Sequence, residues 1–198
     1  AVLLDNCITY ANGTKLDGTG NGDGNGFKLG GDGIAIKHIL RNSISWGNGV
    51  NGVTCNSNPA LILDRVTVYG NGNYNIALYG KGKAESNPRT FEAKGVLSMK
   101  GGAGDNYKEK QDLLTVDNFF FNGAQTQNAE KTTLDNSVFV SVDISKLQNG
   151  YNDDGSFNRI PRDKNGIFLL GDLFKLTDKV PAGVGADYNK MYEATNAK

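Results

Sequence analysis

The sequence is poor in several residue types, and each shortage excludes a class of protein. Only 4 prolines accompany 27 glycines, so the chain is neither collagen-like nor a Pro/Gly low-complexity segment. His38 is the only histidine, which leaves no multi-histidine metal site and no Ser-His-Asp triad; we expect it to be an outer strand residue. No apolar run approaches the length of a membrane span. The 21 basic and 21 acidic residues cancel, and without a basic stripe nucleic-acid binding is disfavoured.

Cysteine and targeting signals are also scarce. Cys7 and Cys55 are the only two cysteines; they could pair, but we expect them on different parts of the fold, as buried thiols without a disulfide. The chain has neither a signal peptide nor an initiator Met and opens directly in strand-like AVLLDNCITY. This favours a mature or truncated product whose targeting information is gone.

What the chain has in excess is glycine, about twice the usual share. Asn and Gly dominate the first 80 residues, and both adopt left-handed backbone conformations at low energetic cost. The composition therefore predicts many tight turns between short strands. The length of 198 residues suits one domain with a real core.

The first 80 residues contain an internal repeat. The segments LDNCITYANG (4–13), LRNSISWGNG (40–49) and LDRVTVYGNG (63–72) each start with Leu, carry an aromatic residue six positions later and close with Asn-Gly. A second short strand follows each: GFKLG from Gly26, GVTCN from Gly52 and NIALY from Asn75. The second and third units are 23 residues apart, while the glycine-rich stretch lengthens the first.

This period, with short strands and Asn/Gly turns, predicts an all-β fold, a right-handed parallel β-helix. Equivalent residues of successive coils would stack about 4.8 Å apart in aliphatic, aromatic and Asn ladders. LLTVDNFFFNGA (113–124) and TLDNSVFVS (133–141) are expected to be later coils, and residues 100–112 a charged loop. We predict coils over residues 1–145 and, over 146–198, an irregular capping tail that packs on the last coil or along one flank.

Lys28 stands out within the glycine-rich stretch. Strand alternation places Phe27 and Leu29 on the core face and Lys28 on the outer face, in register with Thr54 and Ala77. A cation on a shallow outer face suits an anionic polymer. A solvated surface lysine is the simpler interpretation of the spacing alone.

Three stretches together resemble polysaccharide lyase family 9, whose members are right-handed parallel β-helix enzymes that cleave pectic polysaccharides. They are NGDGNGFKLGGDG (21–33), HILRNSISWGNGVNGVTCNSNPA (38–60) and LDRVTVYGNGNYNIAL (63–78). The resemblance covers residues 1–80 specifically and the tail more loosely. It implies that Lys28 is the Brønsted base of a β-elimination, helped by Ca²⁺ that neutralises the uronate carboxylate.

The same resemblance sets further expectations. It implies a secreted or periplasmic enzyme that acts as a monomer on an acidic polysaccharide. A nearby cation and partial desolvation would lower the pKa of Lys28. The family's calcium ligands are aspartates on coils that precede the lysine, and the sequence starts just after the place where that stretch is expected. No metal ligands are therefore assigned; Asp17, Asp23 and Asp32 could bind a cation, but solvated carboxylates that cap turns are the favoured interpretation.

Four residues on the following coils are candidate substrate contacts. Asn56 and Asn58 could bind sugar hydroxyls, although an Asn ladder that stabilises the turn is the favoured alternative. Tyr79 and Lys81 could offer a stacking face and a carboxylate contact. Trp46 belongs to the aromatic column, where packing is expected rather than sugar stacking.

Two other functions remain as alternatives. In a noncatalytic carbohydrate-binding β-solenoid, Lys28 would only contact carboxylates. A hydrolase is disfavoured because inverting β-helix hydrolases use clustered aspartates on adjacent coils, and these coils do not stack such acids.

Overall fold

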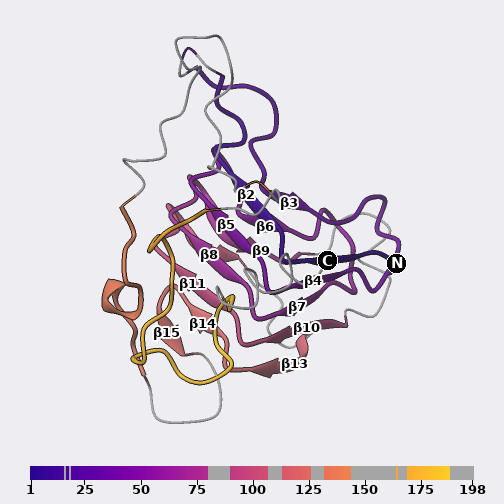
Figure 1. Ribbon diagram of the computed structural model, residues 1–198. Helices are drawn as coiled ribbons and strands as arrows, with labels where there is room; N and C mark the ends of the chain where they lie inside the picture. The colour runs from indigo at the N-terminus through magenta and orange to yellow at the C-terminus, as the bar shows by residue number, and fades with distance from the viewer. Residues whose placement is uncertain are drawn as a thin grey trace.

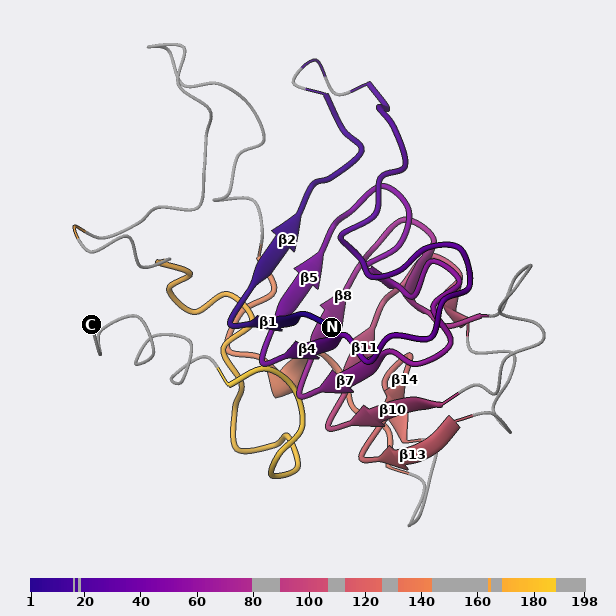
Figure 2. The same ribbon diagram turned by 90° about the vertical axis from the view of Figure 1, so that its right-hand side faces the viewer.

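The computed structural model describes residues 1–15, 17, 19–79, 90–106, 113–125, 132–143, 164 and 169–187. The described chain winds into successive coils (Figures 1 and 2). The first four coils each contribute one strand to each of three sheets, and the fifth contributes to two of them. The predicted right-handed parallel β-helix is confirmed. No helix in this part of the chain has the length and hydropathy of a membrane-spanning segment.

Three sheets, which we name A, B and C, form the walls of the solenoid. Sheet A is built from β1 (Leu3–Asp5), β4 (Ile39–Arg41), β7 (Ile62–Asp64), β10 (Phe91–Lys94) and β13 (Leu113–Asp117). Sheet B is built from β2 (Ile8–Tyr10), β5 (Ile44–Trp46), β8 (Thr67–Tyr69), β11 (Leu97–Met99) and β14 (Phe120–Phe121), with β15 (Ala124–Gln125) added antiparallel. Sheet C is built from β3 (Phe27–Lys28), β6 (Val53–Thr54), β9 (Tyr74–Ala77) and β12 (Gly104–Asn106).

The register matches the repeat read from the sequence. Leu4 pairs with Leu40 and Leu40 with Leu63, and Tyr10, Trp46 and Tyr69 form one column of sheet B. Between sheets A and B each coil bends at one residue with positive φ (Asn6, Asn42, Arg65, Gly95 and Asn118). The Asn-rich and Gly-rich turns thus supply the left-handed conformation that each corner requires.

The interior combines an aliphatic core with a polar ladder. Inward residues of all three sheets, among them Leu63, Val68 and Ile76, are fully buried. Beside them the predicted Asn ladder is confirmed. The side-chain amide of Asn12 donates to the side-chain oxygen of Asn48, that of Asn48 to Asn71, and that of Asn71 to Asn75, each at 2.8 Å. Cys55 is buried, Cys7 is half-buried, and no disulfide joins them.

Two sequence expectations about the later coils were wrong, and one coil was missed. Residues 91–106 form a full coil, and residues 104–106 of the expected charged loop are its third strand, β12. Residues 113–124 belong to a further coil as predicted. Residues 133–141 do not: they hold the 3₁₀ helix η3 (Asn136–Val138) and isolated bridges from Phe139 to Leu176 and from Ser141 to Leu173.

The described part of the C-terminal region packs along one flank of the solenoid, over the outer face of sheet B (Figure 1). Outward residues of sheet B are apolar except Thr67, whose hydroxyl accepts the Ala186 N–H. The apolar ones join Phe139, Leu173 and Phe174 in a second core. Trp46 stacks on Tyr10 with ring centroids 4.9 Å apart and lies 5.2 Å from Phe174. The aromatic column is therefore packed, as expected, but outside the coil rather than within it.

Candidate functional site

Lys28 lies on β3, the first strand of sheet C. Its neighbours Phe27 and Leu29 are buried in the core, while 43% of the Lys28 side chain remains exposed. β3 pairs with β6 so that Lys28 lies beside Thr54, and Thr54 in turn pairs with Ala77. The predicted alternation and register are confirmed, and two apolar anchors hold the amine on the outer face of sheet C.

The glycine-rich stretch is an ordered excursion from the first coil. Its outer part folds back on itself through a Thr14–Gly20 bridge and projects beyond the sheets (Figure 2). It returns to the coil at Gly26, whose N–H donates to the Asn51 carbonyl at 2.8 Å. A Cβ at Gly26 would lie 2.4 Å from the Gly52 carbonyl oxygen. Only glycine fits this close approach, which sets the position of β3.

The Lys28 ammonium has an ion-pair partner that the sequence did not reveal. Its Nζ lies 2.5 Å from Asp23 Oδ2, with both side chains largely exposed. The hydrogen bond and charge of Asp23 raise the pKa of Lys28 above its ordinary value, with a smaller contribution in the same direction from Tyr79. Lys28 in turn lowers the pKa of Asp23. The expectation of a lowered lysine pKa is therefore wrong for this chain alone, because its nearest charge is negative.

Of the predicted substrate contacts, Tyr79 and Asn56 flank the strand that neighbours Lys28. The Thr54 hydroxyl lies 3.5 Å from the Tyr79 hydroxyl and accepts the Asn56 N–H at 3.1 Å. The Asn56 amide donates to the Gly30 carbonyl at 2.7 Å. Lys28, Thr54 and Tyr79 form a continuous strip across β3, β6 and the end of β9, with Asn56 at its border.

Asn58 is placed differently. It is fully buried, its amide donates to the carbonyls of Leu29 and Ile36, and its oxygen accepts the N–H groups of Ile36 and Ala60. These contacts are those of a residue that stabilises the turn, so a substrate role for Asn58 stays a prediction. Lys81 lies outside the described residues.

The described carboxylates near Lys28 do not form a cage for Ca²⁺. Asp17 accepts hydrogen bonds from the hydroxyl and N–H of Thr19, and Asp23 faces an ammonium. Over the described residues, no three His, Cys, Asp or Glu side chains converge as metal ligands would. These residues do not fit a calcium site by themselves.

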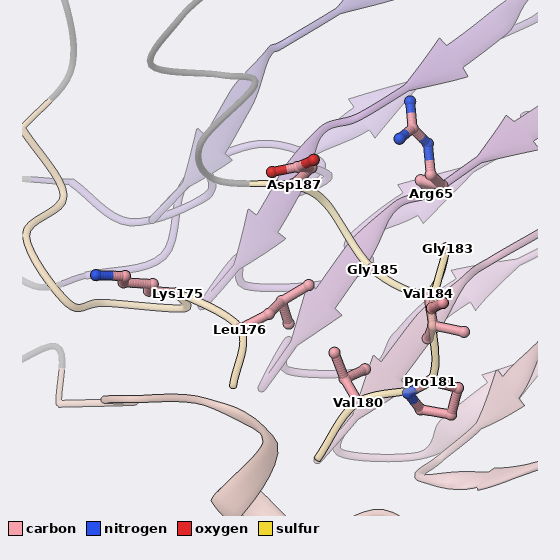
Figure 3. A pocket seen from close by; sticks show the side chains of 10 residues that line it. Arg65, Lys175, Leu176, Val180, Pro181, Gly183, Val184, Gly185 and Asp187 are labelled. Carbon is pink, nitrogen blue, oxygen red and sulfur yellow. The ribbon is translucent and has the colours of Figure 1, made fainter. Parts of the chain in front are cut away.

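A separate hollow of about 190 Å³ lies between the C-terminal segment and the corner of sheets A and B (Figure 3). Arg65, Lys175 and Asp187 contribute charged groups to its wall, beside apolar residues such as Leu176 and Val180. None of the predicted site residues lines it. The candidate site is thus the exposed Lys28 amine on the outer face of sheet C, with Asn56 and Tyr79 beside the buried Thr54.

Comparisons with known proteins agree with this picture. Residues 1–87 match a family model described as the Pel9A-like, right handed beta helix region. The chain is 36% identical over 140 residues to pectate lyase L of Thermoclostridium stercorarium, covering 70% of this chain and 11% of that protein. It is 35% identical over 180 residues to pectate lyase L of Paenibacillus polymyxa, covering 89% of this chain and 34% of that protein.

The crystal structure of pectate lyase Pel9A shares the fold, with a TM-score of 0.51 at 22% identity over 89% of this chain and 38% of that one. The chain therefore spans between about a tenth and four tenths of these relatives. The comparisons confirm the resemblance noted from the sequence, and they show similarity to pectate lyases in sequence and in fold.

Proposed function

We propose that this chain, which carries the Pel9A-like right-handed β-helix region in residues 1–87, is part of a secreted polysaccharide lyase that cleaves an acidic, pectic polysaccharide with Lys28 as base. The proposal depends on one observation: the exposed Lys28 lies on β3, in register with Thr54 of β6. The Lys28 amine extends outward from a strand fixed by two buried anchors, at the position where the family motif has its base.

The chemistry suits a lysine in this setting. The C5 proton of a uronate is acidified by the adjacent carboxylate, and neutral Lys28 Nζ takes it. The electrons of the C5–H bond form the C4=C5 double bond, while the C4–O4 bond breaks and O4 leaves with its electron pair and takes up a proton. Arginine could not replace Lys28, because its guanidinium stays protonated.

The remaining groups of the strip have binding roles in this proposal. Tyr79 offers a ring face and a hydroxyl to the sugar, and Asn56 offers an amide at the border. A calcium ion would neutralise the uronate carboxylate when bound. Since the described residues form no calcium cage, no step of the proposal is assigned to it.

The test is elimination by the protein that carries this chain, measured as ultraviolet-absorbing unsaturated ends released from polygalacturonate or rhamnogalacturonan. Lys28→Ala and Lys28→Arg should each lower the rate by about 10²–10⁴-fold, the usual contribution of a general base. Lys37→Ala is the matched control, because Lys37 is exposed and pairs with Glu92 instead. Full activity of Lys28→Ala would overturn the assignment.

A noncatalytic carbohydrate-binding function is the second candidate, and the ion pair favours it. A lysine kept as ammonium by Asp23 suits contact with carboxylates better than proton abstraction. In that case Lys28→Arg should retain polymer binding, and neither the parent nor the variants should release unsaturated ends. Elimination by the parent protein therefore separates the two functions, and the Lys28 variants then test whether Lys28 is the base.

A further inference from the structure

Asp23 is held next to Lys28 by the backbone on both sides of it. Gly22 and Gly24, which flank it, have positive φ, and the Gly24 carbonyl accepts the Val50 N–H at 2.8 Å. Lys28 is fixed in β3 five residues later. The carboxylate therefore reaches the amine from an anchored turn of the same excursion rather than from a loose loop end.

Among the described residues, few other groups act on the Lys28 amine. Tyr79, from the segment that follows β9, is the second group that influences it, and Thr54, on the neighbouring strand, is uncharged. Asp23 is thus the one described carboxylate paired with Lys28. A proton arriving on Nζ creates a positive charge 2.5 Å from Asp23 Oδ2.

We propose that Asp23 is the positioning residue of the base: it holds the Lys28 amine over sheet C and stabilises the ammonium that forms when Lys28 removes the C5 proton. This inference rests on the proposed function. The carboxylate acts as the acidic partner of a histidine base does, by orienting the base and favouring its charged form. It touches neither the reacting carbon nor the leaving oxygen.

Asp23 should have opposite effects on the rate of elimination at low and at high pH. By favouring the ammonium, Asp23 reduces the fraction of neutral Lys28 in the resting protein. The neutral amines that remain are stronger bases, so each removes a proton faster. Only part of a change in basicity appears in the rate of proton transfer, because general-base catalysis follows Brønsted behaviour. Asp23 therefore slows elimination at a pH below the titration of Lys28 and accelerates it above.

The test compares Asp23→Asn with Asp17→Asn. Both changes remove one exposed carboxylate from the same excursion, but Asp17 contacts Thr19 and not Lys28. The first measurement needs no activity: competitive acylation of the Lys28 amine, followed by mass spectrometry across pH. Asp23→Asn should move the midpoint of the acylation profile to lower pH, which corresponds to a neutral fraction of Lys28 up to about fivefold larger below the midpoint, the upper range for an exposed pair. Asp17→Asn should match the parent.

The second measurement is the pH profile of kcat for elimination. Asp23→Asn should raise the rate below the midpoint and lower the high-pH plateau, each by up to about twofold, so that the two profiles cross. Unchanged acylation of Lys28 overturns the inference even when the protein is a lyase. A uniform loss of rate at every pH overturns it too, because that result indicates a merely structural role. Full elimination by Lys28→Ala overturns the proposed function instead.

Discussion

Sheets B and C belong to the same coils, yet their outer faces are opposite in character. On sheet B the outward residues are large and apolar, and the C-terminal segment covers them (Figure 1). Trp46, for example, is only 3% exposed. On sheet C the outward row is Lys28, Thr54 and Ala77. Thr54 and Ala77 are buried, but 43% of the Lys28 side chain is exposed. The outer face of sheet B is thus a second core, whereas sheet C presents a charged side chain to solvent.

The difference shows how a solenoid separates stability from function. A contiguous apolar strip along sheet B would promote association with other molecules if it remained exposed. The C-terminal segment covers it. On sheet C the exposed residue of the outward row is the charged Lys28, which needs no apolar cover. Residues on the covered outer face of sheet B should therefore govern folding, and exposed residues on the outer side of sheet C should govern binding and chemistry.

Phe174→Ala should have the largest effect on stability. Phe174 is fully buried, and its ring contacts Trp46, Tyr69 and Phe139 at centroid distances of 5.2, 5.2 and 5.6 Å. Removing a buried aromatic ring should lower the free energy of unfolding by about 3–5 kcal/mol, measured by urea denaturation. Val140→Ala, at an exposed site, is the control; an equally large loss there would contradict the division between the two faces.

Asp105 links sheets B and C in the interior of the coil, and its titration should make stability depend on pH. Its carboxylate accepts the Ser98 hydroxyl of sheet B and the N–H groups of Ile76 and Asn122. Burial raises its pKa to about 6. The folded protein therefore binds this proton more tightly than the unfolded chain, and stability falls as pH rises from about 4 to about 6, by about 3 kcal/mol in total.

The check is the free energy of unfolding at pH 4 and pH 7 for the parent and for Asp105→Asn. The parent should lose about 3 kcal/mol more than the variant between these values. Asp172→Asn, which changes an exposed carboxylate, should keep the parent's dependence. If Asp105→Asn also keeps it, another group is responsible.

Asn71→Ala should have an intermediate effect, because the ladder lies beneath both faces. The Asn71 amide accepts from Asn48 and donates to Asn75, so its loss leaves buried polar groups without partners. The free energy of unfolding should fall by about 1–3 kcal/mol, measured by thermal denaturation. Asn21→Ala, in the exposed excursion, should change it far less; equal losses would argue against the ladder.

Tyr79→Phe should have the smallest effect on stability. The hydroxyl that it removes makes one long contact with Thr54, so the free energy of unfolding should change by less than about 1 kcal/mol. If Tyr79 binds the polymer as proposed, KM should rise by about two- to tenfold, the value of one hydrogen bond. A large loss of stability with unchanged KM would mean that Tyr79 stabilises the fold and does not bind the polymer.

Much of the coil could be predicted from local pattern. The repeated Leu, aromatic and Asn-Gly positions set the register of the first three coils, and the alternation around Lys28 set its orientation. The coil of residues 91–106 was missed because Ala93 occupies its Leu position and Met99 its aromatic position. Residues 133–141 imitate the repeat in sequence, but they add no parallel strand to the coils: Thr133 bridges Ala124 in antiparallel fashion, and Phe139 and Ser141 bridge the C-terminal segment.

Periodicity alone was enough to set which side chains point inward, because strand alternation and a 23-residue repeat are local properties of the chain. Other features depended on contacts between distant segments. The covering of Trp46 requires Phe174, Asp105 is buried only because the coils around it meet there, and Asp23 reaches Lys28 only because the excursion returns to the coil at Gly26. The five-residue spacing of Asp23 and Lys28 does not predict that their side chains meet. A turn built on glycines can adopt many conformations, and contacts with the neighbouring coil select one of them.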